Sequence, residues 1–214
     1  MKGAHRGLFI TLEGGDGAGK TTHLSRIQNW LVGRGEQVVV TREPGGTPTG
    51  ERIREILLHG EDRIADEVEL MLMFAARAQS IHDLILPALD AGKCVLSDRF
   101  TDASYAYQGG GRGIPWNRIA ILEDWVQREL QPDLTLVLDV PVETGIKRSV
   151  SRGEASDRFE RSSIDFKSAV RQAYLTRCEQ FPDRVKRVDA SKELEAVARE
   201  IESLLSHKYH HWRI

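Results

Sequence analysis

Residues 14–21 read GGDGAGKT and constrain the chain more than any other segment. They satisfy the pattern GxxxxGK(S/T), follow a short apolar run at 8–13 and open a segment of helical periodicity, which is the context of a phosphate-binding loop. Glycines let backbone amides turn inward around phosphate oxygens, and the start of a helix adds partial positive charge. Because the flanks argue against a chance string, we predict a nucleotide-binding loop here.

The side chains of this loop have distinct expected tasks. Lys20 is placed to reach the β and γ phosphates of ATP, and Thr21 offers a hydroxyl to Mg²⁺. ATP and Mg²⁺ are therefore the expected cofactors. The residues expected to bind ATP are Gly14, Gly15, Asp16, Gly17, Ala18, Gly19, Lys20, Thr21 and Thr22.

Short apolar runs alternate with longer segments of helical periodicity along the whole chain. This alternation predicts parallel strands joined by helical crossovers, and hence a three-layer α/β fold with a five-stranded parallel sheet flanked by helices. The expected strands are residues 8–13, 38–41, 94–97, 134–140 and 185–188.

Three amphipathic segments are expected to be helices. The first starts at Lys20, ends near Gly33 and Gly35, and has one apolar face. Two more are expected to cover the sheet, and their apolar positions are Ile119, Leu122, Val126 and Leu130 in one and Leu194, Val197, Ile201, Leu204 and Leu205 in the other. A further helix between Val68 and Leu89 is apolar on nearly all sides, which fits either a contact with a second subunit or a central helix on the sheet.

Composition limits the domain count and the cellular setting. A chain of 214 residues with 40% hydrophobic content is expected to form a single domain, residues 1–214. With 30 Lys and Arg against 32 Asp and Glu, no global charge favours nucleic acid or a membrane as a partner. The apolar stretch LFITL is too short for a signal peptide or a membrane span, so a soluble cytoplasmic protein is expected.

Charged residues gather at two further places. Asp98 and Arg99 end an apolar strand at the sheet edge where ligands bind, so Asp98 is a candidate for Mg²⁺ and Arg99 for a phosphate. The alternative is a salt bridge at the strand end. Residues 147–161 concentrate five basic side chains around a glycine, which fits either a lid over ATP or a solvated surface.

Several motifs together resemble bacterial thymidylate kinase over nearly the whole chain. They are EGGDGAGKTT at 13–22, TREPGGT at 41–47, LMFAAR at 72–77, SDRF at 97–100 and AYQGGGRG at 106–113. The resemblance implies a P-loop kinase that transfers the γ-phosphoryl group of ATP to dTMP, gives dTDP and serves dTTP synthesis. It also implies a homodimer, with dTMP and ATP as the ligands.

The resemblance assigns roles at the acceptor base. Phe74 would stack on thymine, although a core aromatic is the alternative, and Arg77 would donate to a thymine carbonyl oxygen. Ser104 and Gln108 would contact the remaining edge of the ring. Tyr107 would lie under the sugar, where a ribose 2′ hydroxyl would clash. The family usually has Thr or Asn where this chain has Ser104, so this position departs from the family pattern.

The resemblance also assigns roles at the acceptor sugar and phosphate. Asp16 would accept from the 3′ hydroxyl, while Arg42 and Arg99 would face the acceptor phosphate. No general base is required, because a nucleoside monophosphate is largely ionised near neutral pH, with a second pKa of about 6. Catalysis then consists of neutralising repulsion between two anions and holding the oxygens in line.

Some relatives have an arginine inside the phosphate-binding loop where this chain has Gly17. The missing charge is expected to come from the lid, about residues 148–161. Arg158 is the first choice as the transition-state arginine and Arg152 the second, beside Lys20 and Arg99 as catalytic residues. VDAS at 188–191 resembles the loop that borders adenine.

Two alternatives to this function are open at the level of sequence. One is a kinase for another small acceptor, such as a deoxynucleoside or a different nucleoside monophosphate. The other is a nucleotide-dependent switch without a phosphate acceptor. The absence of an NKxD guanine signature weakens the GTP version of such a switch.

Overall fold

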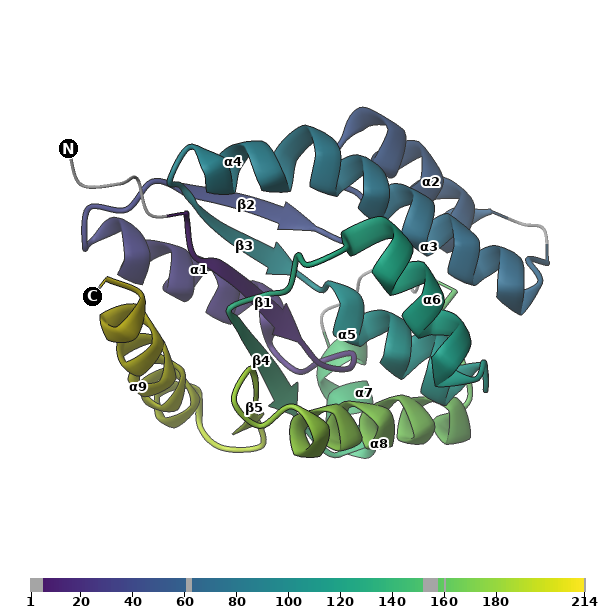
Figure 1. Cartoon of the computed structure of the whole chain (residues 1–214). Coiled ribbons are helices and arrows are strands. Elements are labelled where there is room, and N and C mark those ends of the chain that lie inside the picture. The colour runs from purple at the N-terminus through teal and green to yellow at the C-terminus, as the bar shows by residue number, and fades with distance from the viewer. Residues whose placement is uncertain (1–5, 61–62, 152–157, 160, 214) are drawn as a thin grey trace.

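The computed structural model describes residues 6–60, 63–151, 158–159 and 161–213. Its centre is a five-stranded, all-parallel sheet in the order β2-β3-β1-β4-β5 (Figure 1). All five expected strands are present, and the predicted α/β fold is confirmed. The strands are β1 (Phe9–Glu13), β2 (Val38–Arg42), β3 (Cys94–Asp98), β4 (Leu134–Asp139) and β5 (Val185–Asp189).

Strand β1 shows why this sequence forms the middle of the sheet. Its five residues are all buried, as expected for a parallel strand covered on both faces. Successive side chains point to opposite faces, so Ile10 and Leu12 pack in one core cluster and Phe9 packs in another. In the register of the sheet, Phe9 is opposite Val95 of β3 and Ile10 is opposite Leu134 of β4.

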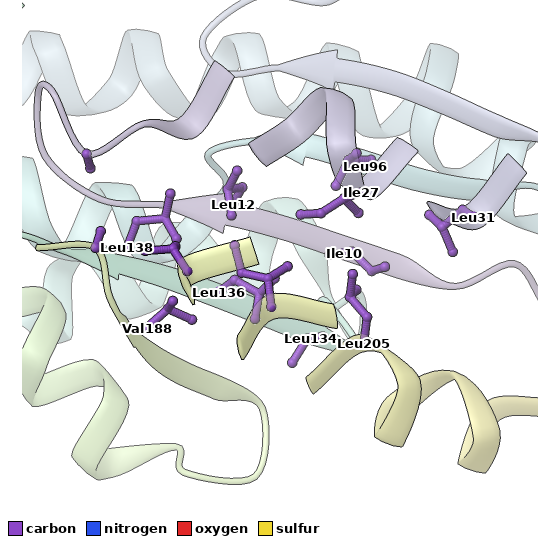
Figure 2. Packing of buried hydrophobic residues seen from close by; sticks show 14 of the residues in the cluster. Ile10, Leu12, Ile27, Leu31, Leu96, Leu134, Leu136, Leu138, Val188 and Leu205 are labelled. Carbon is purple, nitrogen blue, oxygen red and sulfur yellow. The ribbon is translucent and has the colours of Figure 1, made fainter. Parts of the chain in front are cut away.

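One face of the sheet is covered by α1 (Lys20–Val32) and α9 (Leu194–Arg213). Ile27 and Leu31 of α1 and Leu205 of α9 pack in one cluster with the strand residues Ile10, Leu134 and Leu136 (Figure 2). Helix α1 begins directly after the glycine-rich loop and ends at Val32, as the sequence predicts. The core therefore fixes the helix whose first turn follows the phosphate-binding loop.

The remaining helical segments lie at the other face and at the carboxyl ends of the strands (Figure 1). They include two π-helical segments, η1 and η2. Their bounds are α2 (Pro48–His59), α3 (Asp66–Ser80), η1 (Ile81–Ile85), α4 (Leu86–Asp90), α5 (Thr101–Ser104), η2 (Tyr105–Gly111), α6 (Trp116–Gln127), α7 (Val142–Val150) and α8 (Ile164–Gln180).

The helix expected between Val68 and Leu89 is continuous, but its winding changes from α3 through η1 to α4. The π-helical η1 ends two residues before Pro87, which has no backbone N–H to donate within the helix. Local widening accommodates such a residue without ending the helix.

Helix α6 differs from its expected place. Its main contacts are with α3 and η2, and Ile119 packs among residues of those two segments instead of on the sheet. The expected apolar position Leu130 lies beyond the end of the helix, in the cluster that contains Phe9. The sheet-covering prediction therefore holds only at the end of this helix, where Val126 packs against the cluster that contains Phe9 and Val95. A period of 3.6 identifies an apolar face but not the element that covers it.

Among the described residues, the helices are too short or too polar to cross a bilayer.

Candidate active site

The glycine-rich loop joins β1 to α1 at the carboxyl end of the sheet. Gly14, Gly17 and Gly19 have φ angles of 135°, 68° and 91°, a region that other residues rarely adopt. Gly17 also packs against the backbone of α7, where an added Cβ would lie 2.1 Å from the carbonyl oxygen of Gly145. This close approach explains why no side chain, charged or otherwise, occupies the position.

Lys20 is the first residue of α1, and its side chain folds back over the loop. Its Nζ donates to the carbonyl oxygens of Gly14 at 3.2 Å and Gly15 at 3.3 Å. Burial, together with the nearby positive charge of Arg99, lowers the pKa of Lys20 to about 8. An anionic phosphate would reverse this effect by favouring the charged ammonium group, so the site is built for a negatively charged ligand.

Arg99 follows β3 and has a backbone φ of 73°, a strained value for a residue with a side chain. Its Nη1 donates to the carbonyl oxygen of Gly14 at 3.0 Å and to the hydroxyl of Tyr174 at 3.1 Å. The guanidinium lies over the ring of Tyr107, 4.7 Å from its centroid. These contacts direct the Arg99 charge toward the phosphate-binding loop.

A buried carboxyl group supports Arg99 from behind. Glu13, the last residue of β1, accepts from the Tyr174 hydroxyl at 2.7 Å and from the Phe100 backbone N–H at 2.7 Å. Burial, with a smaller contribution from Asp102, raises the pKa of Glu13 to about 8. Glu13 and Tyr174 were not among the predicted site residues, because their pairing joins positions far apart in the chain.

Asp98 and Thr21 are the candidates for Mg²⁺. Asp98 Oδ1 is buried and has no hydrogen-bond partner among the described residues, while Thr21 lies at the exposed start of α1. An unpartnered carboxylate oxygen and a hydroxyl are hard oxygen ligands of the kind that Mg²⁺ takes beside phosphate oxygens. The side chains present therefore fit this ion.

A cavity lies next to the loop and is the candidate acceptor site, referred to below as the acceptor cavity. It combines apolar walls with a few buried polar groups, as small-molecule sites do. Its lining residues are Asp16, Glu43, Pro44, Arg54, Leu58, Met73, Arg77, Arg99, Phe100, Ala103, Ser104, Tyr107, Gln108 and Phe159.

Arg77 presents a fixed donor to the acceptor cavity. It is 2% exposed, and its Nε donates to Glu43 Oε2 at 2.8 Å. Its Nη2 donates to the carbonyl oxygen of Phe100 at 3.1 Å and to Ser104 Oγ at 3.0 Å. Its Nη1 is buried with no partner among the described residues. A buried guanidinium N–H without a partner is costly, so this donor is available to a ligand in the cavity.

Phe74 does not line the acceptor cavity, contrary to the stacking role expected for it. Its ring packs against α6 and η2, in a cluster with Leu70 and Ile119. Met73 lines the cavity instead, four residues before Arg77, because positions i and i+4 share one helix face. The Arg77 guanidinium lies over the Phe74 ring, 4.5 Å from its centroid, so Phe74 supports the cavity from behind.

Arg42 does not line the acceptor cavity, so the structure does not bring it together with the other residues expected at the acceptor phosphate. Thr41 is buried at the end of β2 and Arg42 points to the opposite face, where its guanidinium pairs with Glu51 at 2.9 Å. Arg54 of α2 lines the cavity in its place and donates to the carbonyl oxygen of Pro44 at 2.9 Å. Its position on the helix after TREPGGT was the only signal available in the sequence.

Three further predicted residues do reach the acceptor cavity. Ser104 and Gln108 are nearly fully buried in its wall, and Gln108 Nε2 donates to Glu69 at 2.9 Å. Tyr107 packs edge-to-face on Phe159, with ring centroids 5.6 Å apart. The end of α5 and the adjoining η2 thus bring Ser104, Tyr107 and Gln108 to the same cavity.

Asp16 lies between two cavities. Besides the acceptor cavity it lines a mostly apolar second cavity beside β4 and α8. Its Oδ2 is 3.4 Å from Lys167 Nζ of α8. The loop position therefore borders the acceptor side, as its expected contact with a sugar requires.

A third cavity borders other residues of the loop. It is lined by loop residues including Gly17, Ala18 and Gly19, by Thr22, and by Ala190 of the VDAS segment. Arg148 of α7 closes one side by donating to the carbonyl oxygen of Ala190 at 2.8 Å. This geometry suits the base of the nucleotide donor.

Of the two lid arginines, only Arg158 can be placed, because Arg152 lies outside the described residues. Arg158 Nη2 donates to Glu69 Oε2 at 2.5 Å. Glu69, on α3, also accepts from Gln108 and Arg112. Nothing in the sequence pointed to Glu69 as the partner of these three side chains.

A parallel sheet ending in a glycine-rich loop, with the lysine and arginine side chains of Lys20 and Arg99 directed at that loop, defines the class of P-loop phosphotransferases. The thymidylate kinase family model matches residues 12–201. The thymidylate kinase of Alkalilimnicola ehrlichii is 54% identical over 97% of this chain and 96% of its own length, and that of Pseudomonas entomophila is 58% identical over 93% and 95%. The chain belongs to the thymidylate kinase family, whose reaction is the ATP-dependent phosphorylation of dTMP to dTDP.

A solved structure agrees with this assignment. The crystal structure of thymidylate kinase from Ehrlichia chaffeensis superposes with a TM-score of 0.78 at 30% identity, covering 94% of this chain and 99% of that one. The likeness extends over nearly the whole of both chains, so the two proteins share the fold.

Proposed function

We propose that dTMP binds in the acceptor cavity with its base against Arg77 and Gln108, and that ATP transfers its γ-phosphoryl group to it. The free Arg77 Nη1 carries this proposal, since it is a buried donor that a thymine carbonyl oxygen satisfies. Ser104 continues the polar wall, and Met73 offers a flat apolar contact in place of the expected Phe74.

The sugar and phosphate of dTMP lie between the base and the loop in this arrangement. Asp16 accepts from the 3′ hydroxyl, and the ring of Tyr107 limits the space beneath the sugar. Arg99 and Arg54 face the acceptor phosphate, with Arg54 replacing Arg42 in this role. Each of these four assignments uses a residue that lines the acceptor cavity.

The triphosphate of ATP lies on the loop amides from Gly14 to Thr22, with Lys20 at its β and γ phosphates. Thr21 and Asp98 hold Mg²⁺, which neutralises phosphate charge when bound. The acceptor phosphate is already ionised and needs no general base. Lys20 and Arg99 therefore act by reducing repulsion between the two anions and aligning their oxygens.

The additional charge of the transition state comes from Arg158, with Arg152 as the alternative. Arg158 pairs with Glu69, so its transfer to the phosphates exchanges one anionic partner for another. Arg158→Ala is expected to lower turnover more than dTMP affinity. The reverse pattern would place Arg158 in substrate binding.

The test of the acceptor site is calorimetric titration of dTMP into wild type and Arg77→Met. Loss of a charge-assisted hydrogen bond in a buried site weakens binding by about 10- to 100-fold. Arg52→Met, an exposed arginine on α2, is the matched control and should bind normally. Unchanged dTMP affinity in Arg77→Met would remove Arg77 from the site.

We also propose that this single domain, residues 1–214, works in the cytoplasm as a homodimer joined through α3 and α6. The two helices pack side by side and expose large apolar residues, including Trp125 at 77% exposure, Ile121 and Met71. Sedimentation at micromolar concentration should give a dimer for wild type and a monomer for Trp125→Glu with Ile121→Glu. A dimeric double variant would place the interface elsewhere.

A further inference from the structure

Glu69 is a buried carboxylate whose only part in the proposed reaction is to hold Arg158 before its transfer to the phosphates. It lies on α3 with 1% of its surface exposed. Its two oxygens accept from Arg112, with Nε and Nη2 at 3.2 and 3.0 Å, from Arg158 at 2.5 Å and from Gln108 at 2.9 Å. A buried charge persists only when it is paired, and the two guanidinium groups supply that pairing. Glu69 is therefore a fixed hydrogen-bond acceptor.

The contact with Glu69 decides which end of the Gln108 amide faces the acceptor cavity. A carboxylate accepts hydrogen bonds and donates none, so the amide nitrogen of Gln108 must be the end that turns toward it. The carbonyl oxygen Oε1 is then left on the side of the cavity that Gln108 lines. A glutamine without such a partner can rotate its amide by half a turn and offer a donor instead.

The orientation matters because two pyrimidine bases differ at the atoms concerned. Thymine has an N–H donor at position 3 and a carbonyl acceptor at position 4, while cytosine has an acceptor and an amino donor at these positions. The fixed pair of Arg77 Nη1 as donor and Gln108 Oε1 as acceptor matches thymine at both atoms. It leaves cytosine with two unfavourable contacts in a buried site.

We propose that Glu69 is a positioning residue for base selection, which holds Gln108 with its oxygen toward the acceptor base and so favours dTMP over dCMP. This inference rests on the proposed placement of dTMP in the acceptor cavity. Arg112 contributes by holding both Glu69 oxygens, which prevents the carboxylate from turning away from Gln108.

Glu69→Gln tests the proposal because its amide can donate to Gln108 and so permit the reversed orientation. The readout is the ratio of kcat/KM for dTMP to kcat/KM for dCMP, or of the two binding constants by calorimetry. We expect the ratio to fall about tenfold, the equivalent of one misplaced hydrogen bond. Glu67→Gln, an exposed position on the same helix, should leave it unchanged.

A purely structural role for Glu69 predicts a different result. Both substrates would then lose activity equally, the ratio would remain at the wild-type value, and the proposal would be overturned. In a Gln108→Met background, Glu69→Gln should cause no further change in the ratio, since no amide remains to be oriented. A further tenfold change in that background would equally contradict the proposal.

Pairing Glu69→Gln with Arg112→Gln provides a second route if the single variant does not fold. The double variant removes the carboxylate together with one of its counter-charges, and Arg112→Gln alone is its reference. The ratio should again fall about tenfold relative to that reference; an unchanged ratio would overturn the proposal. Failure of the underlying dTMP site is distinguishable, because wild type itself would then show no preference for dTMP over dCMP.

Discussion

Tyr174→Phe isolates the contribution of one hydroxyl group to the catalytic side of the loop. The hydroxyl donates to Glu13 and accepts from Arg99, and all three side chains lie behind the phosphate-binding loop. Because the ring remains, the packing of Tyr174 against Tyr107 is retained. The variant therefore removes two hydrogen bonds and almost no apolar contact.

The expected loss follows from these two contacts. A buried group left without its partner costs about 1 to 3 kcal/mol, so two such groups give about 2 to 4 kcal/mol after partial relaxation. For a chain of this size 1 kcal/mol corresponds to about 2 to 4 °C in Tm, so Tm should fall by about 4 to 16 °C. Arg99 keeps its bond to Gly14 but loses its second anchor, and kcat should fall about tenfold.

Thermal unfolding followed by circular dichroism, and kcat at saturating ATP and dTMP, measure the two effects. Tyr209→Phe is the matched control, because its hydroxyl donates to Glu36 from the C-terminal helix α9. It should leave kcat unchanged. If Tyr174→Phe kept the wild-type Tm within about 2 °C and the wild-type kcat, Glu13 and Tyr174 would not position Arg99.

Three further outcomes follow from the site. The pKa of Glu13 is raised to about 8 in the folded state, so unfolding releases a proton between about pH 5 and 8. The free energy of unfolding therefore falls as pH rises through this range, by up to about 1.4 kcal/mol per pH unit. Glu13→Gln should remove this dependence of the free energy of unfolding on pH, as measured by denaturant titration at several pH values. If wild type and variant showed the same dependence on pH, the raised pKa of Glu13 would be refuted. Since the pKa of Lys20 is lowered to about 8, kcat/KM for ATP should decline above that pH, whereas a plateau to pH 10 would contradict this value. Arg54→Ala should raise the KM for dTMP about tenfold, and Arg42→Ala should raise it less than twofold. Equal effects would contradict the proposal that Arg54, and not Arg42, faces the acceptor phosphate.

The sequence was sufficient for the sheet and the loop, because both depend on local patterns. The five apolar runs correctly predicted the five strands, and GGDGAGKT correctly predicted a loop between β1 and α1. The positions of Ser104, Tyr107 and Gln108 were also predicted, since one segment carries all three. A motif of consecutive residues thus places side chains well when a single element carries them.

The failures concern directions and long-range pairs. In LMFAAR, Phe74 was predicted to stack on thymine because it is the aromatic residue of the motif. A helix turns about 100° per residue, so Met73 faces the cavity and Phe74 faces α6. Arg42 pairs with Glu51, and Glu69 joins Arg158 to Gln108, through contacts that only the folded chain creates. No periodicity in the sequence records such pairs.

An acceptor panel tests the central claim most directly. ADP release would be measured with ATP and Mg²⁺ in the presence of dTMP, dUMP, dCMP, AMP or thymidine. The family assignment predicts the highest kcat/KM for dTMP, and the Arg77 donor and the Gln108 acceptor in the acceptor cavity predict the rejection of dCMP and AMP. Lys20→Ala should lower the turnover of dTMP by orders of magnitude while the chain remains folded. Preferred turnover of any other acceptor, or ADP release that dTMP does not accelerate, would contradict the account.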